Sequence, residues 1–211
     1  SRRNASLSSV SFCSRYRFMS KVCDSSIPWQ PFTTGESTVL IVPMTKVGKK
    51  RMHSPMANGR SSGYTSMGSA RASACHTLAA EGRAHEFEET FSAIRERYLG
   101  IVEELGLSPE CIATQLEQAR FAILSGMGPD YAASRGEFLN GLLLSAYLGW
   151  EFIDAAEVIF FDAAGRFDAE RTQEVLSARL GRTEYAVIPG FYGSLPNGEI
   201  KTFTRGGSDV T

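Results

Sequence analysis

Apolar residues recur at helical spacing through the middle of the chain. Between residues 85 and 105 they follow one another at steps of three, four and one, at Phe87, Phe91, Ile94, Tyr98, Ile101, Val102 and Leu105. This spacing places them on one face of a helix, and Gly106 supplies its stop. The pattern therefore predicts an amphipathic helix over residues 85–105.

Two more helices are expected after it. Ser108 and Pro109 are residue types that begin helices, and the segment after them carries Ile112, Leu116, Phe121 and Leu124 before glycines end it. The next helix is predicted over residues 131–148, with Phe138, Leu142 and Ala146 facing inward and Gly149 as its stop.

From residue 150 the pattern changes to short apolar runs that predict strands. These runs are 152–153, 158–161 and 185–188, with a helix capped by Asp168 over 168–180 and an extended segment at 201–204. An earlier run, STVLIV at 37–42, predicts a buried strand. Strand, helix and strand in this order indicate a βαβ unit with parallel strands and an α/β fold. Ligands are then expected beyond the strand ends near Phe161 and Pro189.

Charge divides the chain into two parts. Residues 1–80 hold eleven Lys and Arg against two acids, Asp24 and Glu36, whereas the remainder holds eleven against 21. Residues 1–72 are a basic, Ser/Gly-rich leader, for which disorder or a non-native sequence is favoured over a transit peptide. KVGKKR at 46–51 is interpreted as a solvated loop and not as a nucleic-acid patch. We therefore expect a leader over 1–72, a domain over 73–211, and no nucleic-acid or membrane partner.

The four cysteines, Cys13, Cys23, Cys75 and Cys111, lack the spacing of metal ligands. We interpret them as free thiols in a reducing compartment, the cytoplasm, and expect no metal site.

Two motifs carry candidate chemistry. Arg205, Gly206, Gly207, Ser208 and Asp209 follow one another after the glycine-containing run PGFYGS at 189–194. Glycines admit an anion close to the backbone and arginine grips a carboxylate, so RGGSD is either an anion site or a glycine-rich turn.

The second motif is SRGE at 134–137 on the third predicted helix. Gly136 weakens that helix by about 1 kcal/mol relative to alanine, which suggests that something packs close to it. Glu137 is either a ligand for an ammonium group or an ordinary exposed glutamate.

The order and spacing of SRGE, PGFYGS and RGGSD give residues 73–211 a resemblance to the kinase domain of aspartokinases, in the amino-acid kinase family. The resemblance implies a partial three-layer α/β sandwich with a mainly parallel sheet, truncated at both ends. It also implies an aspartate kinase activity: ATP, with Mg²⁺, phosphorylates the β-carboxylate of L-aspartate to 4-phospho-L-aspartate. That reaction is the first step towards lysine, threonine and methionine.

The resemblance implies residue roles as well. Glu137 contacts the amino group of aspartate, and Arg205 holds its α-carboxylate. Gly206 and Gly207 allow close backbone approach, and Ser208 and Asp209 lie where the substrate loop meets the ATP side, with Asp209 as the catalytic candidate. The full enzyme is expected to be a homo-oligomer.

The sequence departs from the family in two places. The family's first strand is followed by K-F-G-G-[TS], whose lysine contacts the transferring phosphate, and residues 1–72 lack this motif. The chain also stops at Thr211, before the adenine-binding half and the regulatory ACT domains. We expect a shifted reading frame or mis-called start in 1–72, and an aspartate-binding half that is inactive alone. The alternatives are a non-catalytic amino-acid-binding or interaction fragment, and a basic tail that delivers the domain to nucleic acid or an organelle.

Overall fold

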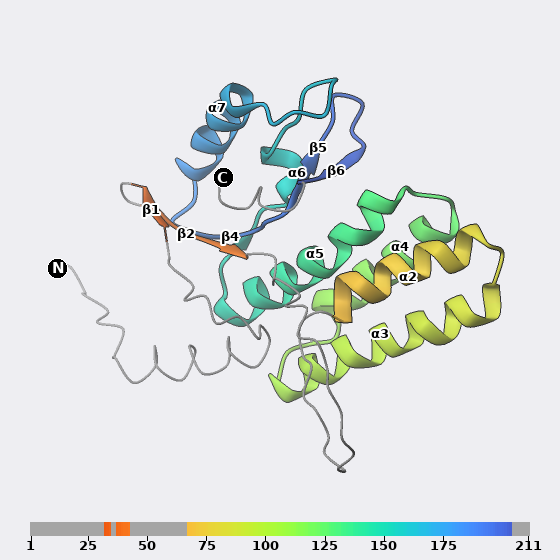
Figure 1. The fold of residues 1–211 in the computed structure, drawn as a ribbon. Helices are drawn as coiled ribbons and strands as arrows, with labels where there is room; N and C mark the ends of the chain where they lie inside the picture. The colour runs from red at the N-terminus through yellow and green to blue at the C-terminus, as the bar shows by residue number, and fades with distance from the viewer. Residues whose placement is uncertain (1–31, 35–36, 43–66, 204–211) are drawn as a thin grey trace, which may run out of the picture. The chain divides into compact units, whose positions relative to one another are not determined.

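The computed structural model describes residues 32–34, 37–42 and 67–203 (Figure 1). The candidates Arg205, Gly206, Gly207, Ser208 and Asp209 lie outside these residues, as does most of the predicted leader. The division at residue 73 therefore stays a prediction.

Four helices form one group: α2 (Met67–Ala80), α3 (Ala84–Glu104), α4 (Glu110–Leu124) and α5 (Pro129–Leu148). The last three confirm the helices expected from the spacing of apolar residues. Gly149 ends α5 with φ 69°, in the left-handed region that glycine adopts without strain. The sequence pattern did not predict α2, because its residues show no amphipathic period and its first turn belongs to the basic segment.

The apolar stripe of α3 is buried as predicted. Phe87, Phe91, Ile94, Tyr98, Ile101 and Val102 all face the core, and the rings of Phe87 and Phe91 stack with centroids 5.8 Å apart. Burial of large aromatic and aliphatic side chains along one face is the main force that holds such a helix in place.

The inward face of α4 differs from the prediction. Ile112 and Leu116 are buried, but Phe121 is 71% exposed and Leu124 41% exposed. Phe121 follows Ile112 by nine residues and so lies about 180° around the helix from it. Ala119 and Ile123 complete the buried stripe instead.

A four-stranded sheet joins distant parts of the chain. Its strands are β1 (Phe32–Thr34), β2 (Ser37–Val42), β3 (Glu151–Phe152) and β4 (Tyr185–Pro189), in the order β1-β2-β4-β3. β4 pairs in parallel with β2 and with β3, whereas β1 and β2 are antiparallel. The predicted strand at 37–42, the βαβ unit and the mainly parallel sheet are confirmed.

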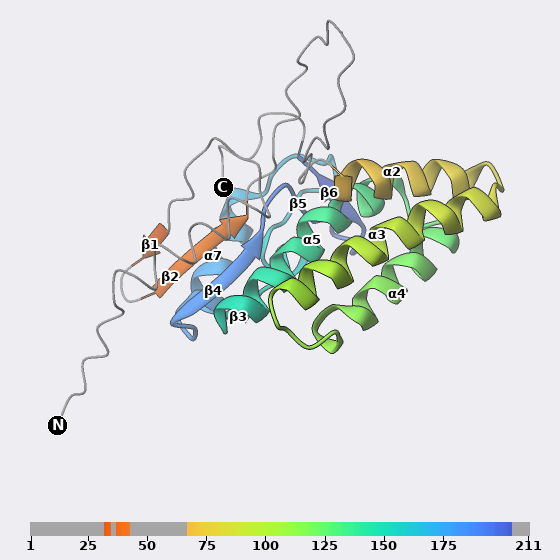
Figure 2. The ribbon, with the colours of Figure 1, turned by 90° about the horizontal axis from the view of Figure 1, so that it is seen from below.

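Helices lie on both sides of this sheet (Figures 1 and 2). The crossover from β3 to β4 contains α6 (Ala155–Val158) and α7 (Ala169–Leu180), with α7 on the opposite side of the sheet from α5. Asp168 caps α7 as expected, since its carboxylate accepts a hydrogen bond of 3.1 Å from the amide of Arg171. The part of the chain that the structure describes is thus a partial α/β fold.

The strand predicted at residues 158–161 is wrong. Val158 ends α6, and Phe160 and Phe161 form only isolated bridges, with Ser194 and Phe167. Asp154 favours the helix here, because its side chain caps α6 through a 3.0 Å bond from the amide of Ala156. Two later strands, β5 (Tyr192–Ser194) and β6 (Ile200–Thr202), form an antiparallel pair.

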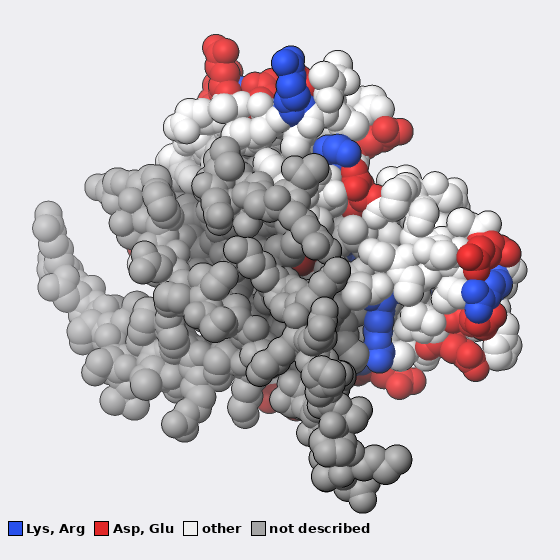
Figure 3. Space-filling model, viewed as in Figure 1, with Lys and Arg blue, Asp and Glu red and all other residues white. Residues whose placement is uncertain are grey.

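Charged side chains of both signs mix on the described surface (Figure 3). At the turn between α2 and α3, Arg83 pairs with Glu81 and with Glu86. Exposed pairs of this kind contribute little to stability, because water screens them. None of the described helices is long and apolar enough to cross a bilayer.

Candidate functional site

Glu137 lies in the first half of α5 and is buried, with 7% of its surface exposed. Its carboxylate accepts a hydrogen bond of 2.7 Å from the Ser69 hydroxyl of α2. Burial raises the pKa of Glu137 to about 7, while the Ser69 hydrogen bond and the charge of Arg135 act in the opposite direction. The interpretation of Glu137 as an ordinary exposed glutamate is therefore wrong.

Gly136 lets α2 approach α5 at this point. A Cβ atom at this position would lie 2.6 Å from the Ser69 backbone nitrogen and 2.1 Å from its hydroxyl oxygen. The close packing predicted from the glycine is confirmed, and the neighbour is Ser69. On α3, Tyr98 donates towards the Gly136 carbonyl (3.2 Å) and Asn140 Oδ1 (3.1 Å), which ties a third helix to the same turn.

The loop after β4 presents strained backbone beside the sheet. β4 ends at Pro189 as expected, and Phe191, two residues on, has φ 79°. A side chain rarely adopts this angle, and such strain gathers at functional sites. The Phe191 carbonyl accepts a 2.8 Å bond from the amide of Phe203, which holds the strained residue in place.

Gly193, in the middle of β5, is a position where close packing requires a glycine. A Cβ atom there would lie 2.4 Å from the carbonyl oxygen of Ile159. The strand therefore packs directly against the segment that follows α6.

The half-buried Asp154 and the buried Tyr192 are polar partners that the sequence did not reveal. The Tyr192 hydroxyl donates a 2.7 Å hydrogen bond to Asp154 Oδ1, and Tyr192 is fully buried. Burial and the Asp154 charge raise the pKa of Tyr192 well above its usual value, so the phenol stays a donor. Asp154 follows β3, which ends at Phe152, so the second loop at this sheet edge begins here and not at the expected Phe161.

A third polar contact ties β6 to the start of α5. Asp130, in the first turn of α5, accepts a 2.6 Å hydrogen bond from the Thr202 hydroxyl and pairs with Lys201 at 3.2 Å. Hydrogen bonds from Thr202 and Lys201 hold the pKa of Asp130 below its usual value despite partial burial, so the carboxylate stays charged. Thr202 precedes the predicted anion site at Arg205 by three residues.

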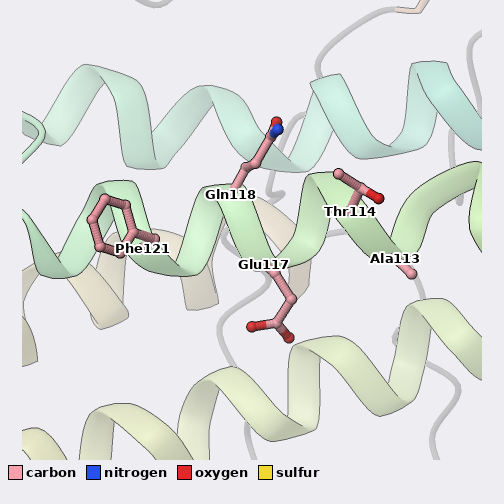
Figure 4. Close-up of a pocket in the computed structure, with 5 residues that line it drawn as sticks. All are labelled: Ala113, Thr114, Glu117, Gln118 and Phe121. Atoms are coloured by element: carbon pink, nitrogen blue, oxygen red, sulfur yellow. The ribbon is translucent and has the colours of Figure 1, made fainter.

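Two hollows are lined by described residues. An open groove is lined by Ala113, Thr114, Glu117, Gln118 and Phe121, all on α4 (Figure 4). A closed cavity of about 10 Å³ adjoins Arg135 and Gly136 among apolar side chains. It has room for about one water molecule and none for a substrate. The small cavity lies beside the turn of α5 that carries Glu137, whereas the open groove is lined by α4 alone.

Cysteine and metal chemistry have few candidates in the described residues. Cys75 and Cys111 are free thiols, and burial raises the pKa of Cys75 to about 11. Within residues 67–203, no three His, Cys, Asp or Glu side chains gather as a metal site would require.

Comparison with known proteins supports the predicted resemblance. No family model matches the chain. Aspartokinase 3 of Bacillus subtilis is 31% identical over 147 residues, which cover 63% of this chain and 31% of that protein. Aspartokinase 1, chloroplastic, of Arabidopsis thaliana is 30% identical over 151 residues, covering 61% of this chain and 26% of that one.

Solved structures give the same result. The aspartate kinase of Clostridium acetobutylicum superposes with a TM-score of 0.65 at 44% identity, covering 72% of this chain and 34% of that enzyme. Aspartokinase III of E. coli in complex with lysine and aspartate superposes with a TM-score of 0.55 at 25% identity, covering 66% and 36%. The chain thus spans about a third of the length of the relatives that it matches, and its resemblance to aspartokinases is confirmed.

Proposed function

Because this chain is similar to about a third of the aspartokinases that it matches, we propose that it supplies the amino-acid-binding part of an aspartate kinase. The observation that carries the proposal is Glu137, a buried carboxylate whose described hydrogen-bond partner is the neutral hydroxyl of Ser69. A buried carboxylate is costly unless a cation or several donors satisfy it. The α-ammonium group of an amino acid is a cation with three donors and fits this need.

Binding of the ammonium group would favour the ionised form of Glu137. A cation close to a carboxylate lowers its pKa, and the effect is strong where water is excluded. The pKa of Glu137 is about 7 in the structure without a ligand. Affinity for the amino acid should therefore rise with pH up to about 7 and level off above it.

The α-carboxylate of the same ligand is assigned to Arg205, with Gly206, Gly207 and Ser208 around it. The contact between Asp130 and Thr202 supports this assignment. It fastens β6, three residues before Arg205, to the first turn of the helix that carries Glu137. The two ends of a short amino acid could then be held from neighbouring elements.

The reaction of the whole enzyme is phosphoryl transfer. An oxygen of the aspartate β-carboxylate would attack the γ-phosphorus of ATP, the bond to the β,γ-bridging oxygen would break, and ADP would leave. Catalysis of this kind depends on positioning and on charge neutralisation, to which Asp209 is assigned. The contacts to ATP and Mg²⁺ are assigned to parts of the enzyme outside the third that this chain matches. The oligomeric state and cytoplasmic location stay predictions.

Isothermal titration of the full chain with L-aspartate at pH 8 tests the binding proposal. We expect saturable binding that Glu137→Gln abolishes and that Glu157→Gln, at an exposed glutamate of α6, leaves unchanged. N-acetyl-L-aspartate keeps both carboxylates but lacks the ammonium group, so it should not compete. Equal binding of the acetylated compound would contradict the role of Glu137.

A coupled assay for ADP release, with ATP and Mg²⁺ present, separates catalysis from binding. Aspartate binding without turnover is the result expected for an amino-acid-binding part alone. ADP release that depends on L-aspartate would show instead that the chain carries a complete kinase site.

A further inference from the structure

Arg135 is a buried cation whose hydrogen-bond partners among the described residues are all neutral. Only 7% of its surface is exposed. Its Nη2 and Nε donate to the Ser134 hydroxyl at 2.9 and 3.2 Å, and Nε also donates to the Tyr131 carbonyl at 3.4 Å. Within the described part of the chain, no carboxylate forms an ion pair with it.

Three aromatic rings surround the guanidinium of Arg135. Its central carbon lies 4.3 Å from the ring centres of Tyr131 and Phe138, one turn away on either side along α5. Tyr192 of β5 contributes a third ring at 5.7 Å. Cation–π contacts stabilise a desolvated arginine, and planar stacking fixes its direction. The rings therefore hold the charge in place between α5 and β5.

Glu137, two residues further along α5, is a buried anion without a cationic hydrogen-bond partner among the described residues. It is equally buried, and its described hydrogen bond comes from a hydroxyl group and not from a cation. Residues two apart on a helix point in different directions, so the two side chains cannot form a close ion pair through helix geometry alone. A buried charge without compensation is costly, but opposite charges in the same dry layer attract each other without contact.

Other titratable groups on the elements against α5 are engaged elsewhere or lack a resolved influence on Glu137. Tyr192 is bonded to Asp154, Lys201 to Asp130, and Glu151 to Arg179. On α3, the Tyr98 hydroxyl is bonded to the Gly136 carbonyl and to Asn140. The remaining groups on these elements are Arg71, Cys75 and His76 on α2, Glu110, Cys111, Glu117 and Arg120 on α4, and Tyr185 on β4. Arg135 is the charged group that acts on the Glu137 carboxylate and lowers its pKa against the effect of burial.

We propose that Arg135 is a positioning residue for the amino-acid site. The three rings hold its charge two residues from Glu137 along α5, in the same buried layer and without an ion pair between the two side chains. The charge favours the ionised form of Glu137 without forming an ion pair with it, so the role of cationic partner is left to the ammonium group of the ligand. This inference rests on the proposed function for its ligand, but the effect on Glu137 ionisation does not depend on it.

NMR titration of the Glu137 side-chain carboxyl in the full chain tests the inference without ligand. In Arg135→Gln we expect the midpoint to move upward by about one pH unit, the size of shift that a nearby charge produces. Arg135→Lys keeps the charge and should restore most of the wild-type midpoint. Arg171→Gln is the matched control, because Arg171 also stacks on a ring, that of Phe160 at 4.0 Å, outside this site. An unchanged midpoint in a folded Arg135→Gln chain would overturn the inference.

A measurement on the wild-type chain covers the case in which Arg135→Gln does not fold. The Arg135 Nε–H resonance should shift with pH at the midpoint of Glu137, and this step should vanish in Glu137→Gln. Absence of the step in the wild type would also overturn the inference.

Ligand affinity separates this inference from the proposed function. At pH 6, Arg135→Gln should bind L-aspartate about tenfold more weakly than the wild type, and at pH 9 nearly equally, because Glu137 is ionised in both at high pH. An equal loss at both pH values would indicate a purely structural role and contradict the inference. A wild-type chain that binds no L-aspartate but shows the shifted carboxyl midpoint would remove the proposed function and leave the effect of Arg135 standing.

Discussion

The helices α3 and α5 have similar lengths but bury different kinds of residue. α3 buries one stripe of apolar side chains and exposes charged residues on its other face. α5 is buried around most of its circumference in its first half, where Ser134, Arg135 and Glu137 lie among apolar neighbours. Burial on α3 follows from the hydrophobicity of its stripe, whereas α5 also buries two charged side chains, whose desolvation is costly.

The largest loss of stability is expected from a substitution on α3. Phe87→Ala removes a fully buried ring that stacks on Phe91, so we expect the free energy of unfolding to fall by about 3–5 kcal/mol. Urea denaturation followed by circular dichroism measures the change. A loss below about 1 kcal/mol would mean that α3 is not anchored by its stripe.

Glu137→Gln on α5 should raise the free energy of unfolding at high pH. The pKa of Glu137 is about 7 in the folded chain against 4.5 for an ordinary glutamate, so folding binds a proton between these values and wild-type stability falls as pH rises from about 4.5 to 7. The glutamine variant escapes this loss. At pH 8 it should be more stable than the wild type by about 3 kcal/mol, with the difference vanishing near pH 4. Denaturation of both chains at pH 4 and pH 8 checks the sign, and a stability difference independent of pH would contradict it.

Each of the two helices contains a glycine that can be replaced by alanine to compare how closely its neighbours pack. Gly136→Ala on α5 would force Cβ into Ser69 and should cost about 1–3 kcal/mol. Gly100→Ala on α3 meets no described atom within 4 Å, so better helix propensity should stabilise the chain by about 0.5–1 kcal/mol. Thermal unfolding of the two variants side by side measures both, and effects of the same sign would contradict the difference in packing.

The smallest effect is expected at Phe121. Its ring is 71% exposed, so Phe121→Gln should change the free energy of unfolding by no more than about 0.5 kcal/mol. Urea denaturation again provides the measurement. A loss comparable to that of Phe87→Ala would show that Phe121 is covered in solution.

The sequence predicted α3 because its apolar residues, at steps of three and four, lie on a single face of a helix, and only that face can be buried. The same reasoning misplaced Phe121 on α4, where Ala119 and Ile123 continue the stripe and a large apolar residue lies on the outside. It missed α2, whose small residues produce no amphipathic signal. Helical contacts are local, so their periodicity is visible in the chain, whereas the pairing of β2 with β4 is set by residues that lie far apart in sequence.

Prediction of the site had a similar limit. Gly136 signalled close packing, and the resemblance to aspartokinases singled out Glu137, but no pattern indicated that Ser69 would be the neighbour. The pair of Asp154 and Tyr192 joins residues 38 apart in sequence and has no spacing that would reveal it. A spacing signal for Arg135 did exist, since Tyr131 and Phe138 flank it at four and three residues.

The left-handed backbone angle of Phe191 has a consequence for which substitutions this position tolerates. Glycine would adopt its backbone angle with less strain, so relaxing the turn is a single substitution away. A phenylalanine at this angle offers something that glycine lacks: a rigid aromatic surface just beyond the carboxyl end of β4. Exchange of Phe191 for glycine would relieve the backbone strain at this position and remove a half-buried aromatic ring from the loop.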